Sequence, residues 1–270
     1  MRFASALLVA PALGFLAGCA SLPDSQSAEV RGHRLEFART GAGTPTVVFE
    51  AGLGDSMSVW ADVLPGVSAF APTFAYSRAG AGGSGLALER RDGARIVAEL
   101  RALLQAQGVR PPYLLVGHSL GGLYQQLFAR LYPAEVAGLV LVDSTHPDQN
   151  ARFRAALPVR YAQTRAMLLL AAGPMSLESS QIERTGEQVR AAGPLPRVPT
   201  IVLSATQTSL LEGADFRKFF LTLQDDLVAQ TPGAEHWLAA HSGHYIQRDE
   251  PELVVRAIRQ VWTAATQRAP

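Results

Sequence analysis

Short runs of apolar residues alternate with longer segments of helical periodicity over most of the chain. Runs with the length of a buried strand lie at residues 46–50, 72–77, 113–117, 137–143, 199–205 and 236–240. Helical patterns occupy residues 89–107, 120–131 and 251–265. Strands that alternate with helices favour an α/β fold with a mostly parallel central sheet and helices on both faces.

The interval 144–198 interrupts this alternation. It is much longer than an ordinary connection between a strand and a helix, and it contains its own helical stretch around residues 159–172. Insertions that follow the carboxyl ends of parallel strands lie over the ligand crevice of such sheets. We therefore expect residues 144–198 to form a helical lid or cap over the site.

The strongest chemical signal is the sequence Gly-His-Ser-Leu-Gly at residues 117–121, where an apolar run meets a helical segment. A serine at such a sharp turn has a strained backbone, and the residues two before and two after it must be small to avoid collision. Gly117 and Gly121 meet that need. The pattern predicts that Ser119 presents its hydroxyl at a helix N-terminus, where backbone N–H groups favour a developing negative charge.

A serine hydroxyl is a weak nucleophile until a base removes its proton. His244 is the first candidate, because it lies between the last predicted strand and the last predicted helix, on the edge where the other active groups gather. His241 is the alternative. His118 is expected to pack against the turn or support it, and His33 and His146 are expected at surface or lid positions.

Several stretches, in this order along the chain, resemble the α/β-hydrolase family, and the resemblance covers roughly residues 30–268. They are VVFEAGLGDS at 47–56, YSRAGAGGS at 76–84, VGHSLGG at 116–122 and SGHYIQRDEPELV at 242–254. The resemblance implies an α/β-hydrolase fold over residues 33–270 and a serine esterase or lipase-like activity. It implies no metal and no organic cofactor.

The same resemblance implies an oxyanion hole formed by two backbone N–H groups. Carried onto this chain, the donors are the amides of Leu120 and Leu53. This chain has Ala51-Gly52 where the family commonly has His-Gly, so it lacks a side chain that often supports this loop.

The acid that orients the histidine has more than one candidate. Many family members place it shortly after the strand that corresponds to residues 199–205, but Thr-Gln-Thr-Ser-Leu follows that strand here. Asp143, at the end of the run 137–143, satisfies the chain order Ser, Asp, His and lies on the correct edge. We favour Asp143, with Glu212 and Asp215 as the alternatives.

These residues predict cleavage of carboxylic esters through an acyl-enzyme intermediate. Acyl transfer and cleavage of amides or lactones use the same groups, and a non-catalytic envelope binding protein on the same fold is a further alternative. Haloalkane dehalogenation is disfavoured, because it needs a carboxylate at the position of Ser119.

The charge balance argues against polyanionic partners. The chain of 270 residues has 24 basic and 23 acidic residues and a formal net charge of +1. No long basic track is present for nucleic acid. We expect a small-molecule acyl ester as substrate, and no obligate protein partner is evident.

The N-terminal residues predict a location in the cell envelope. Residues 1–19 begin with Arg2, continue with a short apolar stretch and end in Leu-Ala-Gly-Cys, which resembles the lipobox of bacterial lipoproteins. The resemblance implies a signal peptide at residues 1–18, lipid attachment at Cys19 and a flexible tether over residues 19–32. It implies anchoring to a membrane, the outer membrane if the host is Gram-negative. The single cysteine excludes an internal disulfide and a cysteine-based zinc site.

Overall fold

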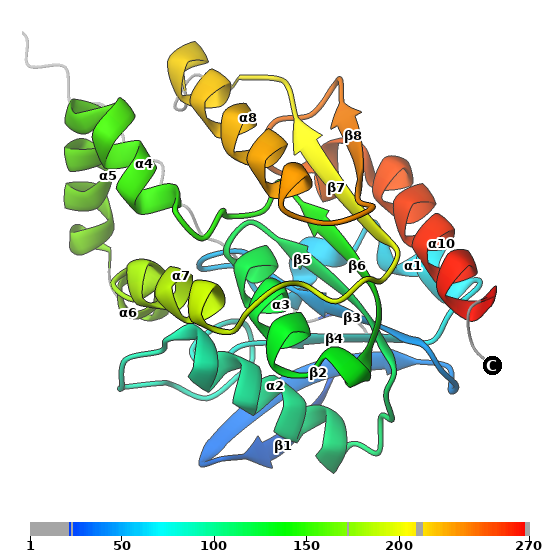
Figure 1. The fold of residues 1–270 in the computed structure, drawn as a ribbon. Helices are drawn as coiled ribbons and strands as arrows, with labels where there is room; N and C mark the ends of the chain where they lie inside the picture. The colour runs from blue at the N-terminus through cyan, green and yellow to red at the C-terminus, as the bar shows by residue number, and fades with distance from the viewer. Residues whose placement is uncertain (1–21, 23, 172, 209–212, 268–270) are drawn as a thin grey trace, which may run out of the picture.

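The computed structural model describes residues 22, 24–171, 173–208 and 213–267. Within these ranges the chain forms an eight-stranded sheet with the order β1-β2-β4-β3-β5-β6-β7-β8 (Figure 1). The strands are β1 (Gln26–Val30), β2 (His33–Thr40), β3 (Thr46–Glu50), β4 (Thr73–Ser77), β5 (Tyr113–His118), β6 (Val136–Val142), β7 (Thr200–Ala205) and β8 (Glu235–Ala239). The signal peptide, Cys19 and the alternative acid Glu212 lie outside the described residues.

The sheet is mostly parallel, as predicted. Strands β3 to β8 pair in parallel, and only the pairs β1–β2 and β2–β4 are antiparallel within the described chain. Strands β3, β4, β5 and β7 are buried along their whole length. This explains why they read as continuous apolar runs, because both faces of a parallel sheet are covered.

The hairpin formed by β1 and β2 corrects the prediction of a flexible tether for residues 26–32. Residues 19–21 and 23 of the predicted tether lie outside the described residues. Residues Gln26–Val30 pair with β2 across a two-residue turn, in which Arg31 and Gly32 have φ values of 51° and 86°. Two positive φ values are typical of the tight turns that match the twist of a hairpin. Strand β1 is an edge strand and only Val30 is fully buried, so its sequence has the polar character of a linker.

Helices cover both faces of the sheet (Figure 1). On one face α2, α3 and α7 pack in one apolar cluster, and on the other α1 and α10 pack in a second cluster. The helical segments are η1 (Met57–Trp60), α1 (Leu64–Ser68), α2 (Gly93–Ala106), α3 (Leu120–Leu131), η2 (Pro133–Glu135), α4 (Gln149–Ala156), α5 (Pro158–Leu170), α6 (Pro174–Ser179), α7 (Ile182–Ala191), α8 (Ala214–Ala229), α9 (Ile246–Asp249) and α10 (Pro251–Gln267).

The apolar face predicted for the segment 89–107 is the buried face of α2. Its members are Ile96, Val97, Leu100, Leu103 and Leu104, and each is at most 1% exposed. The helix begins after Asp92, whose side chain accepts a hydrogen bond from the Arg95 amide. A side-chain acceptor of this kind satisfies an amide that has no partner inside the helix.

The interval 144–198 contains α4, α5, α6 and α7, all between β6 and β7 in the chain. Helix α7 packs on α2 and α3 and belongs to the body of the fold. Helices α4 and α5 pack on each other and project to one side of the sheet (Figure 1). No helix in the described ranges is long and apolar enough to cross a bilayer.

Candidate active site

The carboxyl edge of the sheet brings Ser119, His244 and Asp143 into one hydrogen-bonded row. The distance from His244 Nε2 to Ser119 Oγ is 2.9 Å, and the distance from His244 Nδ1 to Asp143 Oδ2 is 2.7 Å. A carboxylate can only accept a hydrogen bond, so Nδ1 carries the proton that is donated to Asp143. The lone pair of Nε2 therefore faces the serine hydroxyl, an arrangement that can remove the hydroxyl proton.

Ser119 lies at a strained turn between β5 and α3. Its φ and ψ are 52° and −122°, a conformation that residues with a Cβ atom rarely adopt. Two backbone hydrogen bonds tie this turn to the end of β6 and the residues after it, one from the Ser119 amide to Val142 O at 3.0 Å and one from the Thr145 amide to Ser119 O at 2.9 Å. The end of β6 therefore fixes the direction of the Ser119 side chain.

The two glycines of the motif are required by contact distances. A Cβ atom on Gly121 would lie 2.4 Å from Ala51 O and 2.5 Å from Glu50 O, and one on Gly117 would lie 2.6 Å from the Cα of Gly122. The contacted atoms belong to the backbone and cannot rotate away. The same contacts place the turn at Ser119, called the elbow below, directly against the end of β3 and the loop that follows it.

Asp143 is fully buried and is held by several donors. Besides His244, the Ala205 amide donates to its Oδ1 at 3.0 Å, and Arg217 Nη1 lies 3.2 Å and 2.9 Å from its two oxygens. Burial alone raises the pKa of the Asp143 carboxyl, but the hydrogen bond and charge of His244 and the charge of Arg217 outweigh burial and lower it. The carboxylate is therefore ionised at neutral pH.

The other candidates for the base and the acid lie elsewhere. Asp215 is exposed in the first turn of α8. His241 is also exposed, and its amide donates to Glu250 at 2.8 Å. Among the described candidates, His244 and Asp143 are the pair that the structure brings to Ser119.

His118 supports the loop that carries His244, in agreement with its expected role. Its Nε2 lies 2.9 Å from the backbone oxygen of His244 and donates to it, and the two ring centroids are 4.7 Å apart. Burial, followed by the charge of His244, lowers the pKa of His118 to about 3. His118 is therefore uncharged at neutral pH and acts as a hydrogen-bond donor.

The amides of Leu53 and Leu120 lie on the two segments that meet at the elbow. A Cβ atom on Gly52 would lie 2.8 Å from His118 Nδ1, which shows how closely the loop after β3 approaches β5. Leu120 is the first residue of α3, where amides have no acceptor inside the helix. Within the described ranges, neither amide donates a hydrogen bond to another group of the protein.

Sequence reasoning did not find Arg217, the charged partner of Asp143. Arg217 is 2% exposed and occupies the same helical face of α8 as Phe220, Leu223 and Leu227, which are buried. An arginine in an apolar register is the signal that was available, because a buried guanidinium needs a carboxylate partner. The sequence could not name that partner, which is 74 residues away in the chain.

Two histidines lie deeper than expected. His33 is 8% exposed, and its Nε2 lies 3.2 Å from Glu89 Oε1. His146 is 1% exposed, and its Nδ1 accepts from the Asp148 amide at 3.0 Å. The expectation of a surface position was wrong for His33, because the β1–β2 hairpin and α2 enclose it. Within the ranges described, no group of three or more His, Cys, Asp or Glu residues is arranged to hold a metal ion.

Comparison with known proteins places this site in a family. Residues 45–172 match the family described as the alpha/beta hydrolase fold. An uncharacterized protein of Bacillus subtilis, YqjL, is 32% identical over 231 residues, which cover 86% of this chain and 88% of YqjL.

Solved structures agree at the level of the fold. A loop variant of the haloalkane dehalogenase DbeA from Bradyrhizobium elkanii has a TM-score of 0.70 at 18% identity and covers 91% of this chain and 99% of its own. A thermophilic esterase from Thermogutta terrifontis has a TM-score of 0.62 at 19% identity and covers 89% of this chain and 99% of its own. The chain belongs to the alpha/beta hydrolase fold family.

Proposed function

We propose that the protein is a serine hydrolase that cleaves carboxylic esters through an acyl-enzyme intermediate. The observation that carries the proposal is the row of hydrogen bonds that links Ser119, His244 and Asp143. A nucleophile, a base in contact with it and an acid that orients the base together meet the geometric requirement for nucleophilic catalysis.

In this mechanism the Ser119 oxygen attacks the acyl carbon while its proton passes to His244 Nε2. The carbonyl oxygen becomes an oxyanion, which accepts hydrogen bonds from the amides of Leu53 and Leu120. His244 then gives the proton to the leaving alkoxide, and the alcohol departs. Water repeats the sequence on the acyl-enzyme, with His244 as its base, and releases the carboxylic acid and free Ser119.

The role of Asp143 follows from its ionised state. Its carboxylate fixes the Nδ1–H tautomer of His244 and stabilises the positive charge that the ring acquires when it takes the serine proton. Arg217 and the Ala205 amide keep the carboxylate in place.

Support for an ester as substrate comes from the residue at the elbow and from one structural neighbour. Serine at position 119 is the nucleophile suited to acyl transfer, whereas haloalkane dehalogenation requires a carboxylate there. The Thermogutta terrifontis neighbour is an esterase by its description. Ester leaving groups also need less assistance than amines.

The wild-type protein is expected to hydrolyse p-nitrophenyl acetate and butyrate, and a fluorophosphonate probe is expected to label Ser119. The reason is that His244 Nε2 contacts the hydroxyl of Ser119 and can remove its proton. The label is located by mass spectrometry of the digested protein, and heat-unfolded protein is the control, since it keeps the serine but separates it from His244. A folded protein that stays unlabelled, or that is labelled at another serine, contradicts the proposal.

We also propose that the helices α4 to α6, within the interval 144–198, act as a lid. They follow the carboxyl end of β6 in the chain.

We propose in addition that Cys19 carries a lipid and holds the protein on the cell envelope. The support for the anchor is the Leu-Ala-Gly-Cys sequence. Full-length protein expressed in a bacterium is expected to incorporate radiolabelled palmitate and to fractionate with membranes. Cys19→Ser is expected to abolish both properties, and incorporation that survives this substitution rejects the anchor.

A further inference from the structure

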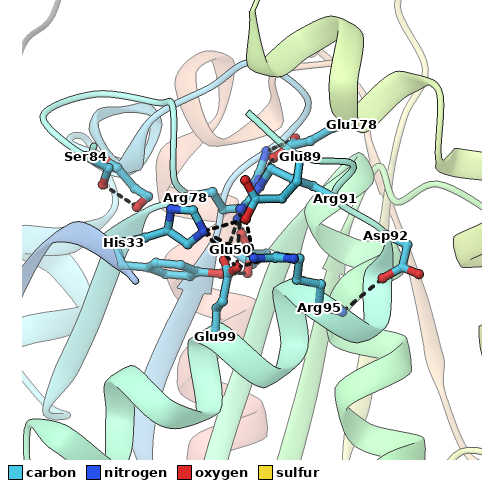
Figure 2. A network of polar contacts seen from close by, with 12 residues as sticks. His33, Glu50, Arg78, Ser84, Glu89, Arg91, Asp92, Arg95, Glu99 and Glu178 are labelled. Atoms are coloured by element: carbon cyan, nitrogen blue, oxygen red, sulfur yellow. Dashed lines mark hydrogen bonds and ion pairs between the residues drawn. The ribbon is translucent and has the colours of Figure 1, made fainter. Parts of the chain in front are cut away.

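A buried guanidinium joins the sheet to the inserted helices. Arg78 directly follows β4 and is 2% exposed. Its Nε and Nη2 each donate to one carboxylate oxygen of Glu178 at 2.7 Å, and its Nη1 donates to Glu50 Oε1 at 2.8 Å. Figure 2 shows Arg78 between these two carboxylates, with Glu178 approaching from α6. Two-point pairing of this kind fixes the plane of the guanidinium.

The same guanidinium also holds the loop that follows β3. Arg78 Nη1 donates to Ala51 O at 2.7 Å, and Nη2 donates to Gly52 O at 2.7 Å. The Gly52 carbonyl and the Leu53 amide belong to one planar peptide unit. A donor that fixes the carbonyl therefore also fixes the direction of the N–H on the opposite side of that unit. A charged donor further polarises the peptide and makes its N–H a stronger donor.

Helix α6 completes this arrangement from outside the sheet. Glu178 is 2% exposed and lies within the interval 144–198, exactly one hundred residues from Arg78 in the chain. Without its carboxylate, the guanidinium would lose the two-point contact that sets its plane. Side chains at position 51 give no such support, because this residue is alanine.

We propose that Arg78 is a positioning residue that aims the Leu53 amide at the oxyanion, and that Glu178 makes this aim depend on the inserted helix α6. The inference rests on the proposed function. It explains how this chain orders its oxyanion loop without a side chain at position 51. It also means that displacement of α6 would weaken transition-state stabilisation without changing Ser119, His244 or Asp143.

The expected effect follows from where the amide acts. Removal of one oxyanion donor costs about 10²–10³ in rate, and loosening its orientation costs part of that. We expect Glu178→Gln to lower kcat about 10-fold and to change KM less than about twofold, because the interaction strengthens only in the transition state. Affinity for phenylboronic acid, which forms a tetrahedral adduct with a serine, is expected to fall by a similar factor.

The matched control is Glu99→Gln. Glu99 is also 2% exposed and is also paired with a buried arginine, Arg91, in the same network (Figure 2). Among the described residues, Arg91 makes no hydrogen bond to the loop after β3, and its Nε reaches Glu178 Oε1 only as a long ion pair at 3.9 Å, beyond hydrogen-bond distance. This variant is expected to lower the melting temperature but to keep kcat and boronate affinity at wild-type values. Arg78→Lys, which keeps the charge but loses the planar fork, is expected to resemble Glu178→Gln.

All rates are referred to active sites counted by complete fluorophosphonate labelling, so that poor folding of a variant does not count as loss of activity. Equal kcat values per labelled site in wild type, Glu178→Gln and Arg78→Lys overturn the inference. So does an equal loss in Glu178→Gln and Glu99→Gln. An inactive, unlabelled wild type instead rejects the proposed function itself.

Discussion

Replacing Ser119 with alanine is expected to reduce the hydrolysis of p-nitrophenyl butyrate by about 10⁴–10⁶-fold. The substitution removes the oxygen that lies 2.9 Å from His244 Nε2 and leaves the base without a partner. The amides of the oxyanion hole remain, so a small residual rate above that of water is expected. The measurement is kcat at saturating substrate for purified wild type and variant.

Ser180→Ala is the control for this experiment. Ser180 is an exposed serine at the end of α6, and its hydroxyl donates to Leu177 O at 2.8 Å. This variant is expected to retain the wild-type kcat. Circular dichroism spectra should show that both variants are folded. Alanine is smaller than serine, so it causes no collision at position 119. Wild-type activity in folded Ser119→Ala would mean that another group is the nucleophile.

Asp143→Asn is expected to lower kcat by about 10⁴-fold. Asparagine presents an amide where the carboxylate accepts the proton of His244 Nδ1, and this favours the tautomer in which Nε2 carries the proton. Such a ring cannot accept the proton of Ser119. The comparison is Asp215→Asn, which changes an exposed carboxylate in the first turn of α8 and is expected to have wild-type activity. Full activity in Asp143→Asn would transfer the role of the acid to another residue.

The same variant should also change how stability depends on pH. The pKa of Asp143 is lowered in the folded state, mainly because the contributions of His244 and Arg217 exceed the effect of burial. A lowered pKa means that the ionised carboxylate stabilises the fold above the ordinary aspartate range, near 3.8, and that this contribution is lost as the pH falls through the folded-state value. The difference in free energy of unfolding between wild type and Asp143→Asn should therefore shrink on acidification, as measured by urea denaturation.

The parts of the fold that the sequence predicted are those in which burial and periodicity agree. The runs that became β3 to β7 are enclosed by helices, so their apolar character is visible without tertiary information. Strand β1 is different. It pairs along the sheet edge through its backbone, and its side chains remain largely exposed, so its composition resembles that of a linker.

Local motifs also predicted more of the site than long-range contacts could. Gly117 and Gly121 indicate a tight turn because the collision they avoid arises within a few residues and the neighbouring strand. The acid could only be ranked by chain order, since the contact between Asp143 and His244 spans 101 residues. Arg78 lies within the stretch 76–84 that carries the family resemblance, but its pairing with Glu178 depends on where α6 packs. No local sequence pattern encodes a contact between residues so far apart in the chain.

The β1–β2 hairpin and the residues just before it leave only a short segment between the folded body and Cys19. Leu22 already packs against the apolar cluster under α1 and α10, so only Ala20 and Ser21 lie between Cys19 and the folded body, a span of three residue steps. An extended segment of that length reaches about 10 Å. An acylated Cys19 would therefore hold the folded body close to the lipid headgroups. Esters that partition into or near the bilayer would then meet the enzyme at a higher local concentration than esters dissolved in the surrounding water.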